Sequence, residues 1–278
     1  IHKCNLYPPR SNLKGGIPCI MVLAIDIGNT HIVVGCFQKD RIVFVERIST
    51  NRTNTTLEYA VSFKTILEIY QIPVSEIEGN IIASVVPSVT NTVKRAVETI
   101  TKQETLLVGP GIKTGLHITI DNPAQLGSNL VVTAVAALHT YQAPIAVIDM
   151  GTATTISVIN KQEEYVGGMI LPGVGISLAA LTEKTSLLQT IDLEKPKKMI
   201  ATNTVDCMRS GVLYGTAYGL DGILQQIEQE MQQPVTAVAT GGLAEVIIPY
   251  CRYPITLDST LLLNGMRIIY QKNRTQKS

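Results

Sequence analysis

Residues 21–35 read MVLAIDIGNTHIVVG. An apolar run ends abruptly in a carboxylate, a glycine, an amide and a hydroxyl, and the chain then becomes apolar again. This pattern predicts two strands joined by a tight turn, with Asp26 at the end of the first strand. Gly28 is expected in the turn, where its missing Cβ lets a ligand approach the backbone. Two interpretations are open for this stretch alone: a plain hairpin, or a loop that holds a metal-bound phosphate.

The same pattern returns later in the chain. Residues 145–159 read IAVIDMGTATTISVI, again an apolar run, Asp, one residue, Gly, hydroxyls and an apolar run. Asp149 lies 123 positions after Asp26, and Gly151 lies 123 positions after Gly28. An internal repeat of domain size indicates two copies of one fold, each with an Asp-x-Gly turn.

Periodicity and turn residues predict the elements around the two turns. Expected strands lie at 41–48, 80–86, 106–108, 165–171 and 235–240, and expected helices at 57–70, 88–100, 127–137, 177–188, 204–232 and 261–272. The first half has three strands, a helix, a strand, a helix and a strand, the order of a ribonuclease-H-like domain. We therefore expect an α/β protein of two duplicated ribonuclease-H-like domains, residues 21–126 and 127–278. Residues 1–20 show no periodicity and are interpreted as a leader or vector-derived segment.

Composition excludes several classes of protein. The chain has 278 residues, 45% of them hydrophobic and 16% charged, which is typical of an ordinary globular protein. The net charge is +1 and the longest basic cluster is residues 195–198, so nucleic acid is not expected as a partner. No apolar stretch approaches the ~18 residues of a membrane-spanning helix. The five cysteines show no C-x-x-C spacing, which favours reduced thiols in a cytoplasmic protein.

The helix expected at 204–232 carries glycine at positions 211, 215 and 219. Small residues four positions apart form a flat stripe on one helix face. This spacing favours close packing against another element, in the same chain or across a dimer, over a role in binding a ligand.

Further motifs accompany the two turns: ASVVP at 83–87, Asn122-Pro123 with Gly127, DMGTATT at 149–155, GGMILPG at 167–173 and TGGLA at 240–244. Paired Asp-x-Gly turns with a strand-Thr-Gly-Gly turn are the parts of the acetate/sugar kinase–Hsp70–actin superfamily, the actin-like ATPase fold. Within that superfamily, residues 21 to about 273 resemble type III pantothenate kinases. The combination of DMGTATT with GGMILPG is highly specific for this family.

The resemblance implies an ATP-dependent kinase that forms 4'-phosphopantothenate, in the first step of coenzyme A biosynthesis. It implies a homodimer with the pantothenate site at the subunit interface, and dependence on Mg²⁺ and on a monovalent cation, K⁺ or NH₄⁺. Asp149 is implied to help hold K⁺, and Thr152 to contact ATP phosphate. The implied first phosphate loop consists of Asp26, Ile27, Gly28, Asn29, Thr30, His31, Ile32 and Val33. The implied pantothenate site consists of Gly127, Ser128, Asn129, Leu130 and Thr204, although Thr204 also fits a helix N-cap.

The chain departs from the family at one decisive position. The family has an Asp at the position of Asn129, usually followed by Arg, and that Asp accepts the proton of the pantothenate hydroxyl. Asn cannot accept a proton at neutral pH, and the loss of a positioned base typically costs on the order of 10²–10⁴-fold in rate. Three explanations are open: natural drift towards a weak or inactive paralogue, an introduced substitution, or a mechanism that relies on positioning alone.

The leading hypothesis is a pantothenate kinase in which Asp26 organises Mg²⁺-ATP and residue 129 faces the attacking hydroxyl. A rival of another class is a non-catalytic nucleotide-binding regulatory homologue, and Asn129 with Leu130 is its support. Binding of ATP and pantothenate without turnover would identify the rival. Another sugar or acyl kinase of the superfamily would need a substrate segment unlike residues 122–127.

Overall fold

The computed structural model describes residues 21–274, so the segment interpreted as a leader lies outside the described residues. Contacts divide this range into two compact units, residues 21–112 with 270–274, and residues 113–269. The sequence-based boundary lies at 126/127. In the first unit, Arg274 pairs with Glu78, which attaches the end of the C-terminal helix to a strand.

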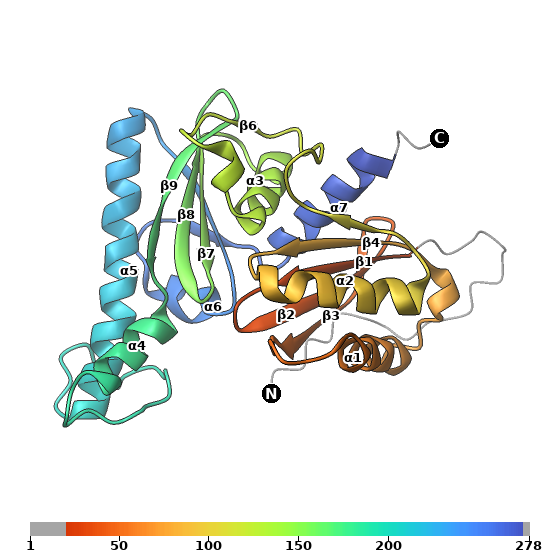
Figure 1. Ribbon diagram of the computed structural model, residues 1–278. Helices are drawn as coiled ribbons and strands as arrows, with labels where there is room; N and C mark the ends of the chain where they lie inside the picture. The colour runs from red at the N-terminus through yellow and green to blue at the C-terminus, as the bar shows by residue number, and fades with distance from the viewer. Residues whose placement is uncertain (1–20, 275–278) are drawn as a thin grey trace. The chain divides into compact units, whose positions relative to one another are not determined.

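The first unit is a five-stranded sheet with two long helices (Figure 1). Its elements are β1 (Met21–Ile27), β2 (His31–Gln38), β3 (Arg41–Ser49), α1 (Thr56–Ile69), the short turn η1 (Val74–Glu76), β4 (Ile77–Ser84), α2 (Pro87–Thr101) and β5 (Thr105–Leu107). The strand order is β3-β2-β1-β4-β5. The first three strands are antiparallel, and β4 and β5 run parallel to β1.

Helix α1 begins with a capping box, because the Thr55 side chain accepts from the Glu58 N–H while Glu58 reaches back to the Thr55 N–H. Helix α2 begins at Pro87, whose ring fixes the first helical φ. Both helices contribute to one hydrophobic cluster with the buried face of β1; its members include Leu23, Ile25, Ile27, Tyr59, Phe63, Leu67, Val93 and Val97. The sheet is thus covered on this face by α1 and α2.

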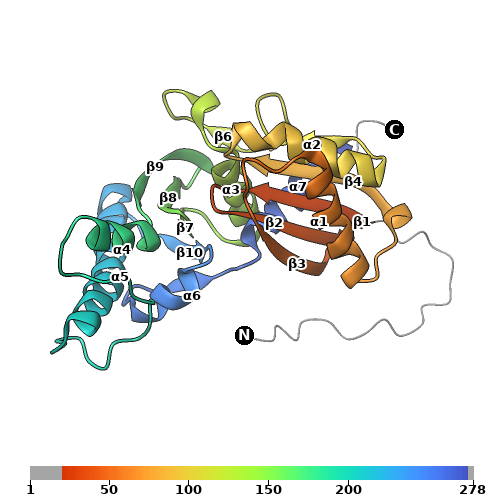
Figure 2. The same cartoon turned by 60° about the horizontal axis from the view of Figure 1, so that its bottom comes forward.

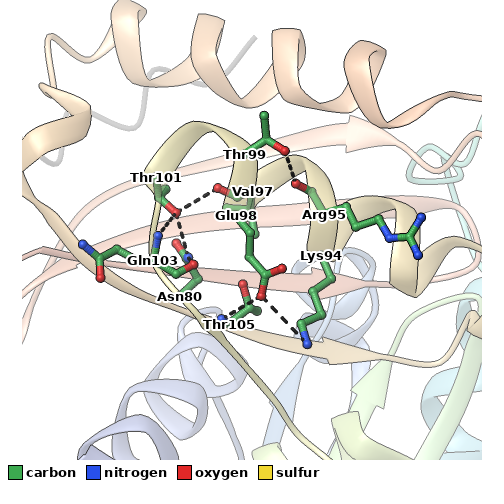
Figure 3. Close-up of polar contacts among 9 residues, drawn as sticks. All are labelled: Asn80, Lys94, Arg95, Val97, Glu98, Thr99, Thr101, Gln103 and Thr105. Atoms are coloured by element: carbon green, nitrogen blue, oxygen red, sulfur yellow. Dashed lines mark hydrogen bonds and ion pairs between the residues drawn. The ribbon is translucent and has the colours of Figure 1, made fainter.

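A buried polar network attaches the end of α2 to β4 and β5 (Figure 3). Asn80 is fully buried, and its Nδ2 donates to Thr101 Oγ1 at 2.9 Å and to the Gln103 carbonyl at 3.1 Å. The Thr105 N–H donates to Glu98 Oε1 at 3.0 Å. These bonds tie the C-terminal end of α2 to the start of β5, beside the pair that Asn80 and Thr105 form in the sheet.

The second unit repeats the same plan. Its elements are β6 (His117–Ile118), η2 (Pro123–Gln125), α3 (Ser128–Thr140), β7 (Ile145–Met150), β8 (Ala153–Ile159), β9 (Glu164–Pro172), α4 (Val174–Glu183), α5 (Thr204–Met231), β10 (Thr236–Thr240), α6 (Ala244–Ile247), η3 (Ile248–Tyr250), β11 (Ile255–Leu257) and the first part of α7 (Leu261–Arg274), whose residues from 270 onward belong to the first unit. The sheet order is β11-β10-β7-β8-β9-β6. Read from β9 to β11 it matches β3-β2-β1-β4-β5, which confirms the duplicated fold.

Helices α3 and α5 lie on opposite faces of the second sheet (Figures 1 and 2). Residues 145 and 147 of β7 cluster with α3, whereas residues 146, 148 and 150 cluster with α5. Alternate residues of a strand point to opposite faces, so Asp149 belongs to the α3 face. This alternation decides which side chains Asp149 can meet.

The structure differs from the sequence-based elements in several places. The helix expected at 177–188 is α4, which begins at Val174, directly after Gly173 as N-cap, and ends at Glu183. Hydroxyl side chains follow at Thr185 and Ser186, and such residues favour turns over helix interiors. The strands β6 and β11 and the helix α6 are two to four residues long, too short for periodicity to reveal them.

Candidate functional site

The first Asp-x-Gly turn lies at the centre of its sheet. Asp26 pairs with Val33 of β2 on one side and with Ala83 of the parallel strand β4 on the other. It is therefore at the carboxyl end of β1, the edge of a parallel arrangement where ligands commonly bind. Gly28, Asn29 and Thr30 connect β1 to β2.

The residues implied for the first phosphate loop differ in exposure. Asn29, Thr30 and His31 are exposed, whereas Ile27 and Ile32 are fully buried. Side chains of the two isoleucines belong to the hydrophobic cluster of the first unit. Only their backbone groups are therefore suited to contact a ligand.

Thr50 holds the shape of the first turn, a role that no local sequence pattern indicates. Its Oγ1 donates to the Gly28 carbonyl at 2.6 Å, and its N–H donates to the Thr30 carbonyl at 3.0 Å. Inside the turn, the Gly28 N–H donates to the His31 carbonyl at 3.0 Å. The carbonyls are thus occupied within the protein.

The second Asp-x-Gly turn has one residue fewer than the first. Only Gly151 and Thr152 separate β7 from β8, and the Gly151 N–H donates to the Ala153 carbonyl at 3.1 Å. Asp149 pairs with Thr155 of β8 and with Thr240 of β10. Thr152 is exposed at the tip of the turn, where it is accessible to a ligand.

Two glycines approach the second turn so closely that a side chain would not fit. A Cβ at Gly173 would lie 2.1 Å from the Thr152 carbonyl oxygen. A Cβ at Gly241 would lie 2.6 Å from the Met150 backbone, and Gly241 has φ +97°, a conformation that favours glycine. The GGMILPG and TGGLA motifs therefore place their turns directly against the turn that carries Asp149.

Asn129 reaches the carboxylate of Asp149. It is the second residue of α3, which begins after Gly127, and the Asn129 side chain is hydrogen-bonded to Asp149. Burial raises the pKa of the Asp149 carboxyl, and the hydrogen bond from Asn129 acts in the opposite direction. Asn129, at the position implied for the proton acceptor, is thus in contact with Asp149, at the position implied for K⁺.

Thr155 presents a buried hydroxyl beside this pair. It lies directly opposite Asp149 in the antiparallel pair of β7 and β8, so both side chains are on the α3 face. Within residues 21–274, its Oγ1 is enclosed and has no hydrogen-bond partner, as is also true of Thr154 Oγ1 on the other face. An orphaned hydroxyl next to a carboxylate is a candidate ligand group for a cation.

Thr204 lies in a different part of the second unit from residues 127–130. It is the first residue of α5, and the N-cap is Asn203, whose side chain accepts from the Asp206 N–H at 2.9 Å. Thr204 lines a cavity of about 690 Å³ formed by β9, α4 and α5, together with Cys207 and the three glycines of the α5 stripe. Residues 127–130 do not line this cavity.

The surface around this cavity is unusually apolar. Leu181 of α4, which lines the cavity, is 38% exposed, and Leu187 and Ile200 of the segment between α4 and α5 are 89% and 83% exposed. A Cβ at Gly211, Gly215 or Gly219 would meet no atom within 4 Å. The glycine stripe therefore packs against nothing among the described residues, and the predicted close packing within the chain is absent from them.

The described residues contain no helix that is long and apolar enough to cross a membrane. Between residues 21 and 274, no group of three or more His, Cys, Asp or Glu side chains is arranged to hold a metal ion. The three cysteines in this range, Cys36, Cys207 and Cys251, form no disulfide with one another.

Comparison with known proteins gives consistent results. Residues 22–226 match the sequence profile described as type III pantothenate kinase. The chain is 38% identical over 253 residues to the type III pantothenate kinase of Halalkalibacterium halodurans, covering 91% of this chain and all of the relative. It is 39% identical over 254 residues to that of Citrifermentans bemidjiense, with the same coverage.

Solved structures share the fold at low sequence identity. A putative Baf family transcriptional activator from Campylobacter jejuni superposes with a TM-score of 0.56 at 19% identity, covering 91% of this chain and 99% of the other. Component A of (R)-2-hydroxyglutaryl-CoA dehydratase from Acidaminococcus fermentans gives 0.55 at 14% identity, covering 92% and 100%. These similarities support the actin-like ATPase fold alone.

Proposed function

The chain belongs to the type III pantothenate kinase family, and from this premise we propose that it transfers the γ-phosphoryl group of ATP to pantothenate, forming 4'-phosphopantothenate. The observation that carries the proposal is the family match over residues 22–226, which includes both Asp-x-Gly turns. In coenzyme A biosynthesis this is the first step.

The first turn is proposed to bind ATP phosphates. Asn29, Thr30 and His31 are exposed beside Gly28, and Thr50 occupies the turn carbonyls, which leaves N–H groups as the polar groups available to an anion. The carboxylate of Asp26 is the type of oxygen ligand that suits Mg²⁺. Bound Mg²⁺ supplies positive charge to the phosphates, and Asp26 is the residue that we assign to hold it.

The second turn is proposed to contact phosphate through Thr152, which is exposed at its tip. For the implied K⁺ or NH₄⁺ the fit is mixed. Asp149 offers a carboxylate and Thr155 an orphaned hydroxyl, both suitable oxygen ligands. The Asn129 side chain, however, is already hydrogen-bonded to the carboxylate. When bound, the cation supplies positive charge beside Asp149.

The segment Gly127-Ser128-Asn129-Leu130 is proposed to line the pantothenate site. Because Thr204 of the same chain lines a different cavity, we assign Thr204 to this site as a contribution of the other subunit of the proposed homodimer. Asn129 orients the hydroxyl of the substrate without accepting its proton, because an amide is not a base at neutral pH. Phosphoryl transfer through a loose transition state depends mainly on positioning and electrostatic stabilisation, so activity survives at a reduced rate. We expect a rate on the order of 10²–10⁴-fold below that of the same protein with a carboxylate at residue 129.

The protein is also proposed to form a homodimer through the apolar surface around α4 and α5. Exposed Leu181, Leu187 and Ile200 and the unpacked glycine stripe of α5 support this proposal. Contiguous exposed apolar patches of this kind mark interaction sites. Light scattering coupled to size-exclusion chromatography tests it: the expected mass is twice that of the chain, and Gly215→Leu is expected to shift the protein towards monomer.

The activity is tested by incubating the protein with ATP, Mg²⁺, K⁺ and pantothenate and identifying 4'-phosphopantothenate by mass spectrometry. Slow formation of the product is expected, and Asp26→Asn should abolish it. If both ATP and pantothenate raise the melting temperature while no product forms, the chain is instead the non-catalytic nucleotide-binding homologue that Asn129 also fits.

A further inference from the structure

The contact between Asn129 and Asp149 joins two residues to which the family assigns separate roles. Asn129 is at the start of α3, and Asp149 is at the end of β7 on the face that α3 covers. An ionised carboxylate only accepts hydrogen bonds, whereas the amide carries two N–H donors. The Asn129 amide is therefore the donor, and its positive end is directed at the carboxylate.

The charge at this place is smaller than it would be with Asp at residue 129. With the Asp149 carboxyl ionised, the Asn129–Asp149 pair carries one negative charge, and the first turn of α3 adds the positive end of a helix dipole beside it. Two carboxylates at these positions would repel each other in a partly buried environment. A monovalent cation between them would relieve that repulsion.

We propose that the Asn129 amide takes over, in this chain, the neutralising role of a monovalent cation at Asp149. Consequently K⁺ and NH₄⁺ bind weakly here, and the substitution Asn129→Asp creates a cation site. The inference rests on the proposed function, which supplies the expectation of a cation at Asp149. Asn129 is thus a positioning residue, because its amide, and not a bound ion, holds the Asp149 carboxylate.

The surroundings of the pair support weak cation binding. Asp149 belongs to no group of three or more acidic, His or Cys side chains among residues 21–274. The neighbouring orphan group, Thr155 Oγ1, is a neutral ligand. One carboxylate that already accepts an amide hydrogen bond, with one hydroxyl, offers fewer and less negative ligands than a pair of carboxylates.

The test is thermal unfolding in KCl and in choline chloride at equal ionic strength, because choline is too large for a K⁺ site. The unmodified protein is expected to melt within about 1 °C in the two salts. Asn129→Asp is expected to melt about 3 °C or more higher in KCl when K⁺ is at least tenfold above its Kd, by mass action on the folded state. The double variant Asn129→Asp, Asp149→Asn should lose this response.

A matched control is available in the hairpin between β8 and β9. Asn160 Nδ2 donates to Glu164 Oε2 at 2.8 Å, the same amide–carboxylate chemistry at a more solvated place. Asn160→Asp adds the same charge, and solvent screens it, so we expect no difference between KCl and choline chloride. This control separates a specific site from a general effect of salt on an added charge.

Two results would overturn the inference: an unmodified protein that responds to K⁺ as strongly as Asn129→Asp, or an Asn129→Asp protein that does not respond. If Asn129→Asp does not fold, Asn129→Glu replaces it, because glutamate also supplies the second carboxylate, and an unresponsive Asn129→Glu protein contradicts the inference equally. The melting measurement needs no turnover. Failure to form 4'-phosphopantothenate therefore refutes the proposed function alone.

Discussion

The two Asp-x-Gly turns come from one duplicated pattern, yet they are supported in different ways. The first turn has three residues and is held from one side by two hydrogen bonds of Thr50. The second has two residues and is enclosed by Gly173 and Gly241, while Asn129 contacts its Asp. The repeated sequence pattern thus determines the strand, the Asp and the turn. The segments that pack against each turn determine which substitutions the turn tolerates.

Removing either carboxylate is the largest expected effect. Asp26→Asn and Asp149→Asn should each lower kcat/KM for ATP by about 10²–10³-fold, because the first loses the carboxylate assigned to Mg²⁺ and the second loses the fixed charge of the second turn. Asp192→Asn, the same change at an exposed residue, should leave kcat/KM unchanged. Steady-state kinetics check this, and full activity in one of the two variants would show that its turn takes no part in catalysis.

The glycines of the second turn should tolerate substitution less than the glycine of the first. Gly241 has a φ of +97°, and a Cβ there would lie 2.6 Å from the Met150 backbone. We therefore expect Gly241→Ala to lower the free energy of unfolding by about 1–3 kcal/mol through backbone strain. The steric overlap adds to this loss. A Cβ at Gly28 would lie 3.0 Å from the His31 carbonyl, a milder overlap.

Urea denaturation of Gly241→Ala, Gly28→Ala and Gly175→Ala measures this difference. Gly175 lies in α4 and a Cβ there would meet no atom within 4 Å, so its replacement should be neutral or slightly stabilising. An equal loss of stability in Gly28→Ala and Gly241→Ala would show that the two turns are equally constrained.

The support of the first turn can be removed without changing its sequence. Thr50→Val keeps the shape of the side chain and loses the 2.6 Å hydrogen bond to the Gly28 carbonyl, which should cost about 1 kcal/mol and raise the KM for ATP several-fold. Thr53→Val is the control, since Thr53 also donates a hydrogen bond but is exposed and bonds to Asn51. If Thr50→Val raises the KM for ATP and Thr53→Val does not, the Thr50 hydrogen bond supports the first turn. Equal KM values for the two variants would contradict this role.

The smallest effect concerns stability at alkaline pH in the second unit. Burial, the hydrogen bond to Glu228 and the Glu228 charge raise the pKa of Tyr253 to about 12. The unfolded phenol ionises near 10 while the folded one stays neutral, so its contribution to stability is present below pH 10 and is lost between about pH 10 and 12. Tyr253→Phe should therefore be less stable at pH 8, with a difference that shrinks as the pH rises. A constant difference across this range would contradict the assignment.

The fold could be predicted from the sequence mainly because of the internal repeat. Two Asp-x-Gly patterns 123 positions apart led to the two duplicated domains and the actin-like ATPase fold, because an apolar run that ends in such a turn is a strong local signal. Thr50 and the contact between Asn129 and Asp149 were not predictable, since both depend on residues that only the tertiary fold brings together. Helix α4 ended earlier than its apolar pattern suggested, and the short strands lacked any periodic signal.

The most direct test of the central claim compares 4'-phosphopantothenate formation by the unmodified protein and by Asn129→Asp under identical conditions with ATP, Mg²⁺ and K⁺. The account predicts slow formation of the product by the unmodified protein and a rate about 10²–10⁴-fold higher for Asn129→Asp, because a carboxylate at this position restores a base. If neither protein forms the product while both bind ATP, the chain is not a pantothenate kinase.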